Sequence, residues 1–321
     1  EDIKKQIPVA FSNFSKVNKG FIDLMQKTFD KPNVFERCKQ QGLLEMLMKF
    51  NKELDTINKS LEDYLQTKRE SFPRFYFLSN DELLKILSQT RNPRAVQDYL
   101  IKCFDGIKTI RFASDTSNEI VSMISPENEE VKLNKELIAH ENIHAWLCDL
   151  EDIMLSTCYD ECQKGLEGHP EFSLNRKSWI LDSGYICQAV ITVDQIMWAQ
   201  SIEKAFLDLE FNENSLKEYL LIMNSQLKEL ADLVMIKPQG ENFEKMILGK
   251  SLLERLVIID VHGRQVLRDL IKENVLDKNN FEWQKNLKFF WEKESYPEGD
   301  RMDIVIRQTN SRFIFGYEYL G

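Results

Sequence analysis

The sequence is short of the residues that interrupt helices. It has 12 glycines and 8 prolines in 321 residues, below the average shares of roughly 7% and 5%. Because turns depend on these two residues, their scarcity predicts long helices joined by few turns. Hydrophobic residues make up 43% of the chain and charged residues 29%. That balance is typical of amphipathic helices in a soluble, extended, mainly helical protein.

Clustered positive charge is also missing. The formal net charge is −10, which argues against a nucleic-acid surface because phosphate binding needs clustered lysine and arginine. No run of about 18 apolar residues suggests a membrane span, and no secretory signal opens the chain. We therefore expect no nucleic acid and no membrane among the partners.

The cysteines show no paired framework that would indicate a disulfide scaffold. This favours free thiols in a reducing, intracellular setting. One pair is spaced by four residues and could join a nearby histidine in a structural zinc site, but a second pair of ligands is not evident. Buried free cysteines are the favoured interpretation. The pair is Cys158 and Cys162, the histidine is His169, and the other cysteines are Cys38, Cys103, Cys148 and Cys187.

Residues 72–87 predict a rigid junction between two long helices. Pro73 lacks an N–H donor and disfavours helical geometry at the residue before it. Ser79 and Glu82 are spaced as the capping box of a new helix. No catalytic group with a partner is evident. The junction itself is expected to be built by a proline, a cation and three consecutive aromatic side chains: Pro73, Arg74, Phe75, Tyr76 and Phe77.

The pattern along the chain predicts a mainly α fold: an elongated irregular array of antiparallel helices, with a small mid-chain β-hairpin and a short C-terminal β element. Helices are expected at 4–29, 42–71, 135–164, 179–209, 216–234 and 243–271, and strands at 107–112, 119–124, 130–133, 304–306 and 313–315. This divides the chain into residues 1–71 (long helices), 72–134 (junction, short helices and hairpin), 135–279 (helical) and 280–321 (aromatic and β).

One enzyme-like motif is present, at His140, Glu141 and His144. H-E-x-x-H on a helix places both imidazoles on one face, where they can hold zinc while the glutamate activates a water. Possible third ligands are Glu161, Cys162 and His169. The motif is short, and no extended zinc-protease pattern follows His144. A zinc-dependent hydrolase is therefore kept only as an alternative.

Other catalytic patterns are absent from the sequence. G-x-S-x-G does not occur, and Gly249-Lys250-Ser251 lacks the preceding glycine of a phosphate loop. Asp260 and His262 lie on a predicted helix at a spacing that turns them in different directions, so a polar contact between helices is expected there. We expect no catalytic residue, no cofactor and no metal in this chain.

Five long stretches of the sequence are distinctive: FPRFYFLSNDELLKIL (72–87), NEIVSMISPENEEVKL (118–133), VIIDVHGRQVL (257–267), FEWQKNLKFFW (281–291) and FGYEYLG (315–321). They resemble the linker region of the dynein heavy chains, and the first of them looks more like the axonemal branch than the cytoplasmic one. The matches cover most of the chain from about residue 40 onward. Gly263 stands where the family commonly has alanine, and 139–144 carries histidines where the family usually has other residues.

The resemblance implies a mechanical role. In that family the linker is a helical arm that lies across a ring of AAA+ modules and bends and straightens as the first module binds and hydrolyses ATP. This chain would be the C-terminal, larger part of such an arm, and flexure is expected between Phe72 and Asp115. The chain would enter the first module at Tyr317, Tyr319 and Gly321, with the phosphate loop beyond. Met123 and Ile124, near the hairpin tip, are candidate contacts to the ring.

The same resemblance implies the wider setting. ATP and magnesium would be bound by the parent motor and not by this segment. The parent would reach the microtubule through distant parts, and the intermediate and light chains through a tail that is missing here. The location implied is the cytoskeleton, in a ciliary or flagellar axoneme. A helical scaffold or adaptor protein is the alternative from a different functional class.

Overall fold

The computed structural model describes residues 4, 6–88, 92–170, 176–182, 184–236 and 243–321. The chain forms two compact units. The first unit comprises Glu1–Ile120 and Leu137–Glu151, and the second comprises Val121–Glu136 and Asp152–Gly321. Long helices dominate, and two small three-stranded sheets lie in the middle and at the C-terminal end of the chain. The predicted mainly α fold is confirmed.

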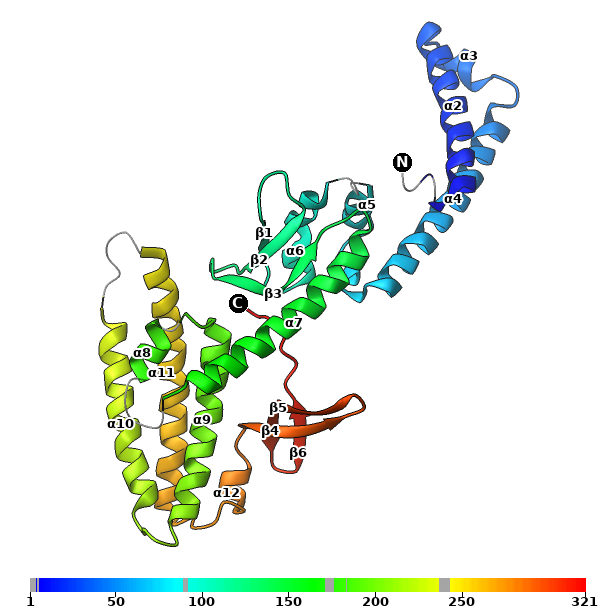
Figure 1. Ribbon diagram of the computed structural model, residues 1–321. Helices are drawn as coiled ribbons and strands as arrows, with labels where there is room; N and C mark the ends of the chain where they lie inside the picture. The colour runs from blue at the N-terminus through cyan, green and yellow to red at the C-terminus, as the bar shows by residue number, and fades with distance from the viewer. Residues whose placement is uncertain (1–3, 5, 89–91, 171–175, 183, 237–242) are drawn as a thin grey trace. The chain divides into compact units, whose positions relative to one another are not determined.

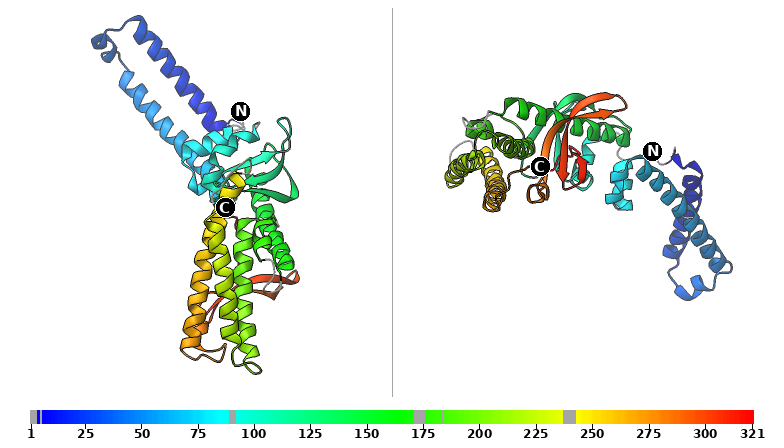
Figure 2. Two further views of the ribbon diagram at one scale, coloured as in Figure 1. Left: turned by 90° about the vertical axis from the view of Figure 1, so that its left-hand side faces the viewer. Right: turned by 90° about the horizontal axis from the view of Figure 1, so that it is seen from below.

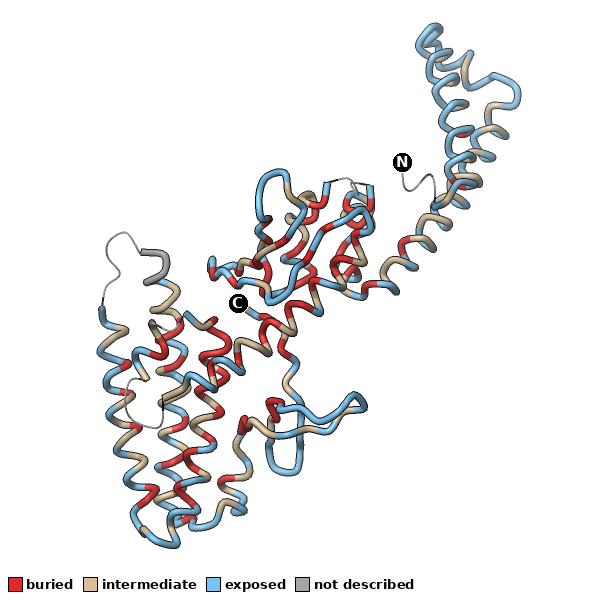
Figure 3. Tube along the Cα trace, in the orientation of Figure 1, coloured by how far each residue is buried: buried red, intermediate tan, exposed pale blue. Residues whose placement is uncertain are grey.

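The first unit begins with a helical hairpin of α2 (Pro8–Asp30) and α4 (Leu43–Ser71), joined through α3 (Val34–Cys38). Figures 1 and 2 show α2 and α4 side by side. Asn33 caps α3, because its side chain accepts hydrogen bonds from the first amides of that helix. Gly42 takes the left-handed conformation (φ +81°) that starts α4. Most of this hairpin is exposed (Figure 3).

The junction after α4 contains two 3₁₀ helices and two short α-helices: η1 (Pro73–Phe77), α5 (Asn80–Ser88), η2 (Pro93–Val96) and α6 (Gln97–Cys103). The predicted capping box is confirmed. The backbone N–H of Ser79 donates to Glu82 Oε2 at 3.0 Å, and the backbone N–H of Glu82 donates to Ser79 Oγ at 3.3 Å. The rings of Phe72 and Phe75 meet edge to face with centroids 4.9 Å apart.

The mid-chain β element is a three-stranded sheet with β2 (Glu119–Ile124) between β1 (Thr109–Phe112) and β3 (Glu130–Ile138). The helix predicted from residue 135 was wrong in its first part, because β3 continues to Ile138 and α7 (Ile143–Gly168) begins only after it. Lys135 and Glu136 belong to residue types that are depleted in strands. The stretch is nevertheless a strand, because side chains at alternate positions turn to one face and bury Val131 and Leu137.

The second unit contains a helical bundle of α8 (Arg176–Asp182), α9 (Cys187–Asp208), α10 (Ser215–Val234) and α11 (Phe243–Lys272). In Figures 1 and 2, α9, α10 and α11 run side by side. The helix predicted for 179–209 is divided in two, and Gly184 in the break has a φ of +77°. Two apolar clusters fill the bundle. One includes Val190, Leu230 and Leu256, and the other includes Phe206, Met223, Leu267 and Trp283.

Gly263 in α11 marks a close approach inside the bundle. A Cβ atom added to it would lie 2.6 Å from Trp198 Nε1. Glycine in a helix interior costs about 1 kcal/mol relative to alanine. Here it makes room for the indole of Trp198, which packs against the indole of Trp283 with ring centroids 5.4 Å apart.

The chain ends in α12 (Phe281–Gln284) and an antiparallel sheet of β4 (Lys288–Tyr296), β5 (Gly299–Gln308) and β6 (Ser311–Ile314). The two predicted strands are present as parts of β5 and β6. β4 was not predicted, because its consecutive aromatic residues obscure the alternation of side chains that marks a strand. Among the described residues, no helix is both long and apolar enough to cross a membrane.

Candidate functional site at the C-terminal segment

Residues 315–321 follow β6 as an extended segment that is held mainly by side chains of other elements of the second unit. Its first anchor is Asp303 of β5, which is fully buried. The Tyr317 hydroxyl donates to Asp303 Oδ1 at 2.6 Å and accepts from the Ile304 backbone N–H at 3.1 Å. Tyr317 has a φ of +53°, a conformation that costs a non-glycine residue of order 1–3 kcal/mol. The surrounding contacts must therefore hold it in place.

The second anchor is Glu129, a buried carboxylate in the turn between β2 and β3. Its Oε2 accepts from the Tyr319 hydroxyl at 2.7 Å, and its Oε1 accepts from the Cys187 backbone N–H at 2.7 Å. That amide belongs to the first turn of α9, where the helix dipole favours a negative charge. Burial and the nearby Glu129 carboxylate raise the pKa of Tyr319, so its hydroxyl stays a hydrogen-bond donor. Glu129 thus joins the turn, α9 and the C-terminal segment.

The third anchor is Gln188 of α9. Its Nε2 donates to the Glu318 carbonyl at 2.7 Å, and its Oε1 accepts from the Leu320 backbone N–H at 2.8 Å. The side-chain amide thereby satisfies two backbone groups of the segment, as a neighbouring strand would. Sequence reasoning missed Glu129, Gln188 and Asp303, because nothing in their local pattern distinguishes them from surface polar residues.

The last residue of the segment also requires its glycine. Gly321 has a φ of +92°, and an added Cβ atom would lie 3.1 Å from Glu127 Oε2 and 3.4 Å from Ser125 Cβ. The structure therefore brings Tyr317, Tyr319 and Gly321 together at one attachment. This attachment contains neither an activated nucleophile nor a cofactor-sized cavity within the described residues, and its chemistry is that of a buried hydrogen-bonded anchor.

The candidate ring contacts lie in β2. Met123 is fully buried, whereas Ile124 is partly exposed. The exposed residues of the following turn are Pro126, Glu127 and Asn128. Contact between this region and a ring of modules stays a prediction.

The junction residues take different environments. The guanidinium of Arg74 donates to Glu151 Oε1 at 2.9 Å and to the Cys103 carbonyl at 3.1 Å. Phe75 is fully buried, but Tyr76 is 55% and Phe77 is 70% exposed. Phe75 thus lies inside the junction, whereas Tyr76 and Phe77 lie at its surface, and a structural role for all five residues stays a prediction.

The H-E-x-x-H motif does not form the helical pair that zinc binding would use. His140 precedes α7, and its Nδ1 accepts from the Asn142 backbone N–H at 3.2 Å. His144 lies within α7 and is half-buried, and burial lowers its pKa. Among the described residues, no group of three or more histidine, cysteine or acidic side chains is placed to hold a metal ion.

Of the other proposed ligands, Cys158 and Cys162 are buried, and Glu161 forms an ion pair with Lys164 at 2.8 Å. Burial raises the pKa of the Cys162 thiol to about 12 and that of Cys158 still further, so both thiols remain protonated. Thiolate is the form that binds zinc. The His169 ring packs against Trp179, with ring centroids 4.6 Å apart. Both cysteines are free, as the sequence predicted.

A buried ion triad connects three helices of the bundle. Arg176 of α8 donates to both oxygens of Asp194 in α9, at 2.9 and 2.8 Å, and to both oxygens of Asp260 in α11, at 2.8 and 2.9 Å. Burial and the Asp194 carboxylate raise the pKa of Asp260 to about 6. The polar contact between helices was predicted for Asp260 and His262 together. It is confirmed for Asp260, whereas His262 is exposed and makes no such contact with a described residue.

A cavity of about 40 Å³ adjoins this triad and is lined by residues that include His169, Trp198 and Tyr219. Binding pockets for organic ligands usually measure roughly 300–1,000 Å³. The cavity has room for a few water molecules only. The triad is therefore a structural connection between helices.

Comparison with known proteins identifies the relatives of the chain. A family described as "Dynein heavy chain, N-terminal region 2" matches residues 1–165. Dynein axonemal heavy chain 6 of Homo sapiens is 36% identical over 339 aligned residues, which cover 100% of this chain and 8% of the relative. Dynein axonemal heavy chain 2 of Mus musculus is 37% identical, with 100% and 7% covered.

A flagellar relative also matches the whole length of this chain. Dynein-1-beta heavy chain of the flagellar inner arm I1 complex of Chlamydomonas reinhardtii is 34% identical, and the alignment covers 100% of this chain and 7% of the relative. The chain thus spans less than a tenth of the length of these relatives.

Proposed function

The chain belongs to the dynein heavy chain family, and from this premise we propose that it is the C-terminal part of the linker, the lever arm of the motor. In this role it bends and straightens over the AAA+ ring of the same heavy chain as ATP is turned over. This bending drives the motor along microtubules. The segment itself is not catalytic. ATP and magnesium are bound by modules outside residues 1–321.

The observation that carries the proposal is the anchoring of residues 315–321. A lever that receives its movement from a following module needs a rigid attachment at the end that leads into that module. Glu129, Gln188 and Asp303 lie on separate elements of the second unit, and each holds the segment through side-chain hydrogen bonds. Force applied at the C-terminal end would thus be spread over α9, the β2–β3 turn and β5 without relying on one backbone connection.

Flexure belongs in residues 72–115 under this proposal. Short helices and 3₁₀ turns replace long helices there, and fewer continuous hydrogen-bond ladders resist bending. α4 and α11, with 29 and 30 residues, are the stiff elements.

The relatives support the proposed setting. They are axonemal and flagellar dynein heavy chains, so we place the parent motor in a ciliary or flagellar axoneme. The microtubule is reached through distant parts of the parent chain, and intermediate and light chains through its tail.

Tyr319→Phe in the parent motor tests the proposal. The variant removes one hydroxyl and leaves the Glu129 carboxylate buried without that donor, which costs roughly 1–3 kcal/mol. We expect slower gliding of microtubules at an unchanged rate of ATP hydrolysis, because the attachment yields while the ATP sites stay intact.

Tyr219→Phe is the matched control. It also removes one tyrosine hydroxyl of the second unit, but that hydroxyl bonds to Ser201 beside the small cavity of the bundle and not to any of the three anchors. Gliding at the normal velocity in both variants would count against the attachment as the point of force transfer. If Tyr319→Phe reduced the gliding velocity and the rate of ATP hydrolysis in proportion, this would contradict the proposal that the segment acts as a lever without taking part in catalysis.

A further inference from the structure

A groove at one end of the helical bundle combines exposed apolar side chains with negative charge. It has a volume of about 650 Å³ and lies between the α9–α10 connection and the segment that follows α11. Figure 1 shows both segments at the same end of the bundle. Two leucines that line the groove have exposed side chains: Leu207 is 58% exposed and Leu276 is 62% exposed. We call it the bundle-end groove; its lining includes Leu207, Leu209, Glu210, Glu213, Leu276 and Asp277.

The same α9–α10 connection carries a further exposed apolar residue. Phe211 is 89% exposed and lines a second pocket, separate from the groove. Single exposed apolar residues are ordinary on protein surfaces. Apolar residues gathered around a concavity and rimmed by polar groups are typical of interaction sites. The exposed Leu207, near the end of α9, and the exposed Leu276, in the segment after α11, both line the groove and therefore indicate a contact surface.

The two connections are ordered before any partner binds. The backbone N–H groups of Phe211 and Asn212 donate to the Asp208 carbonyl at 3.0 and 2.8 Å, and the Ser215 hydroxyl donates to the Ala205 carbonyl at 2.6 Å in a buried position. After α11, the Val275 backbone N–H donates to the Leu270 carbonyl at 2.9 Å. An ordered surface loses less conformational entropy on binding than a mobile loop does.

The charge of the groove limits what it can bind. Glu210, Glu213 and Asp277 line it, and none of them forms an ion pair with another described residue. Two lysines also line the groove. Lys278 faces Glu203 at 3.8 Å, and Lys217 donates to Asn214 Oδ1 at 3.4 Å, so the three carboxylates outnumber the one lysine that is not matched by an acidic partner. The remaining negative charge repels phosphate groups and favours lysine or arginine on a partner.

We propose that the bundle-end groove docks a short basic segment of another polypeptide, with a leucine- or phenylalanine-sized side chain seated between Leu207 and Leu276. Lysine or arginine residues on either side of that anchor face Glu210, Glu213 and Asp277. This inference does not depend on the lever function, because it concerns recognition by a surface and not movement.

The experiment selects binders from a display library of random twelve-residue peptides on immobilised chain 1–321. Recovered peptides are then measured against the chain, against Glu210→Lys/Glu213→Lys, and against Leu276→Ser. The matched control is Glu229→Lys/Asp232→Lys, which makes the same charge change at exposed positions of α10. Hydrogen exchange of the bundle verifies that each variant is folded.

The proposal predicts recovered peptides with net positive charge and one large apolar residue. Reversing Glu210 and Glu213 should weaken their binding about tenfold or more, as expected for losing two close charge pairs. The control should change affinity by less than about twofold. Failure to recover groove-dependent peptides, recovery of acidic peptides, or equal weakening in the control variant would overturn the proposal.

Discussion

The α2–α4 hairpin and the α9–α10–α11 bundle are both built from long amphipathic helices, yet they differ in what those helices bury. In α2 the buried residues are Ala10 and Val17, and in α4 only Leu65. Large apolar side chains such as Phe29 and Phe35 are 81% and 79% exposed. The bundle instead encloses two apolar clusters and a buried ion triad. Helical periodicity therefore predicts which face is apolar, whereas burial depends on how many helices meet there.

The largest expected difference in stability between the two regions comes from removing a positively charged side chain from each. Arg176→Met leaves Asp194 and Asp260 buried without their partner, which should cost about 3–5 kcal/mol of bundle stability. In the hairpin, the Lys49 side chain is 73% exposed and lies 3.9 Å from the Glu53 carboxylate. Lys49→Met removes this ion pair and should lower the stability of the hairpin by less than about 0.5 kcal/mol. Hydrogen exchange of each region measures both effects.

Replacing the whole triad sharpens this test. Arg176→Met combined with Asp194→Leu and Asp260→Leu should restore much of the lost stability, because an apolar set of similar volume needs no charge compensation. Equal, small losses for Arg176→Met and Lys49→Met would contradict the structural role of the triad.

The second prediction concerns pH and applies to the bundle alone. The pKa of Asp260 is raised from 3.8 to about 6, so the folded state binds this proton more tightly than the unfolded state does. Its contribution to the free energy of unfolding therefore increases as pH falls through 6 and levels off below 3.8. The full shift corresponds to an upper limit of about 3 kcal/mol.

Comparison of the wild type with Asp260→Asn at pH 8 and pH 5 isolates this contribution. The wild type should gain stability relative to the variant at the lower pH. Burial lowers the pKa of His169 and opposes the gain, but His169 is present in both proteins. An identical pH dependence of the two proteins would show that Asp260 does not take up the proton.

A smaller effect is expected from adding a single methyl group. The Cβ of Gly263→Ala would lie 2.6 Å from Trp198 Nε1 in the filled bundle, and the resulting overpacking should cost about 1–3 kcal/mol. The Cβ of Gly20→Ala would also lie 2.6 Å from an aromatic atom, Phe50 Cζ in the hairpin. Phe50 is only partly buried, so its ring can move, and the gain in helix propensity of up to about 1 kcal/mol offsets the contact.

Thermal unfolding of the two alanine variants checks this pair. Equal destabilisation of both would mean that the hairpin is packed as tightly as the bundle.

The smallest effect is expected from replacing exposed aromatic residues of the hairpin. Phe29→Ser and Phe35→Ser should each change the free energy of unfolding by less than about 0.5 kcal/mol, as is usual for surface positions. Hydrogen exchange of α2 and α4 at low protein concentration provides the measurement. A loss above about 1.5 kcal/mol, well beyond the range of surface substitutions, would show that another surface covers these residues in solution.

The two regions also show what sequence could predict. The helices of the hairpin follow from apolar spacing and from breaks such as Lys31-Pro32, and the capping box of Ser79 and Glu82 follows from its three-residue spacing. β4 and the end of β3 were missed, because consecutive aromatic residues and a lysine–glutamate pair obscure a period of two. Periodicity does not show which sheet or helix will cover a face.

The attachment of the C-terminal segment was predictable only in part. The resemblance drew attention to Tyr317, Tyr319 and Gly321, but their partners are distant in sequence. Tyr319 and Glu129 are 190 residues apart, and Leu320 and Gln188 are 132 apart. No local pattern encodes such pairs, because their members are far apart in the sequence and only the tertiary fold brings them together.

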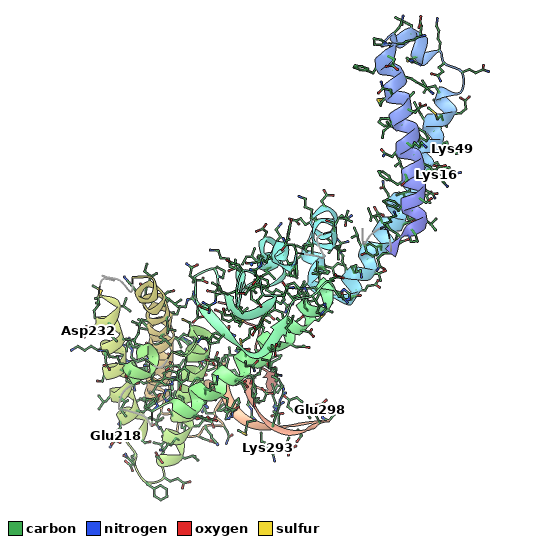
Figure 4. All side chains as sticks on the ribbon, turned by 45° about the horizontal axis from the view of Figure 1, so that its top comes forward. Lys16, Lys49, Glu218, Asp232, Lys293 and Glu298 are labelled. Atoms are coloured by element: carbon green, nitrogen blue, oxygen red, sulfur yellow. The ribbon has the colours of Figure 1, made fainter. Side chains whose placement is uncertain are left out.

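The lever proposal is tested most directly by a distance measurement in the parent motor. Dyes incorporated at Lys49 of α4 and Asp232 of α10, both at labelled surface positions in Figure 4, report on the two units by energy transfer. The proposal predicts that the Lys49–Asp232 distance changes when ATP is added, while a control pair within α10, Glu218 and Asp232, stays constant. An unchanged Lys49–Asp232 distance in nucleotide-free and ATP-bound motor would contradict bending of this chain.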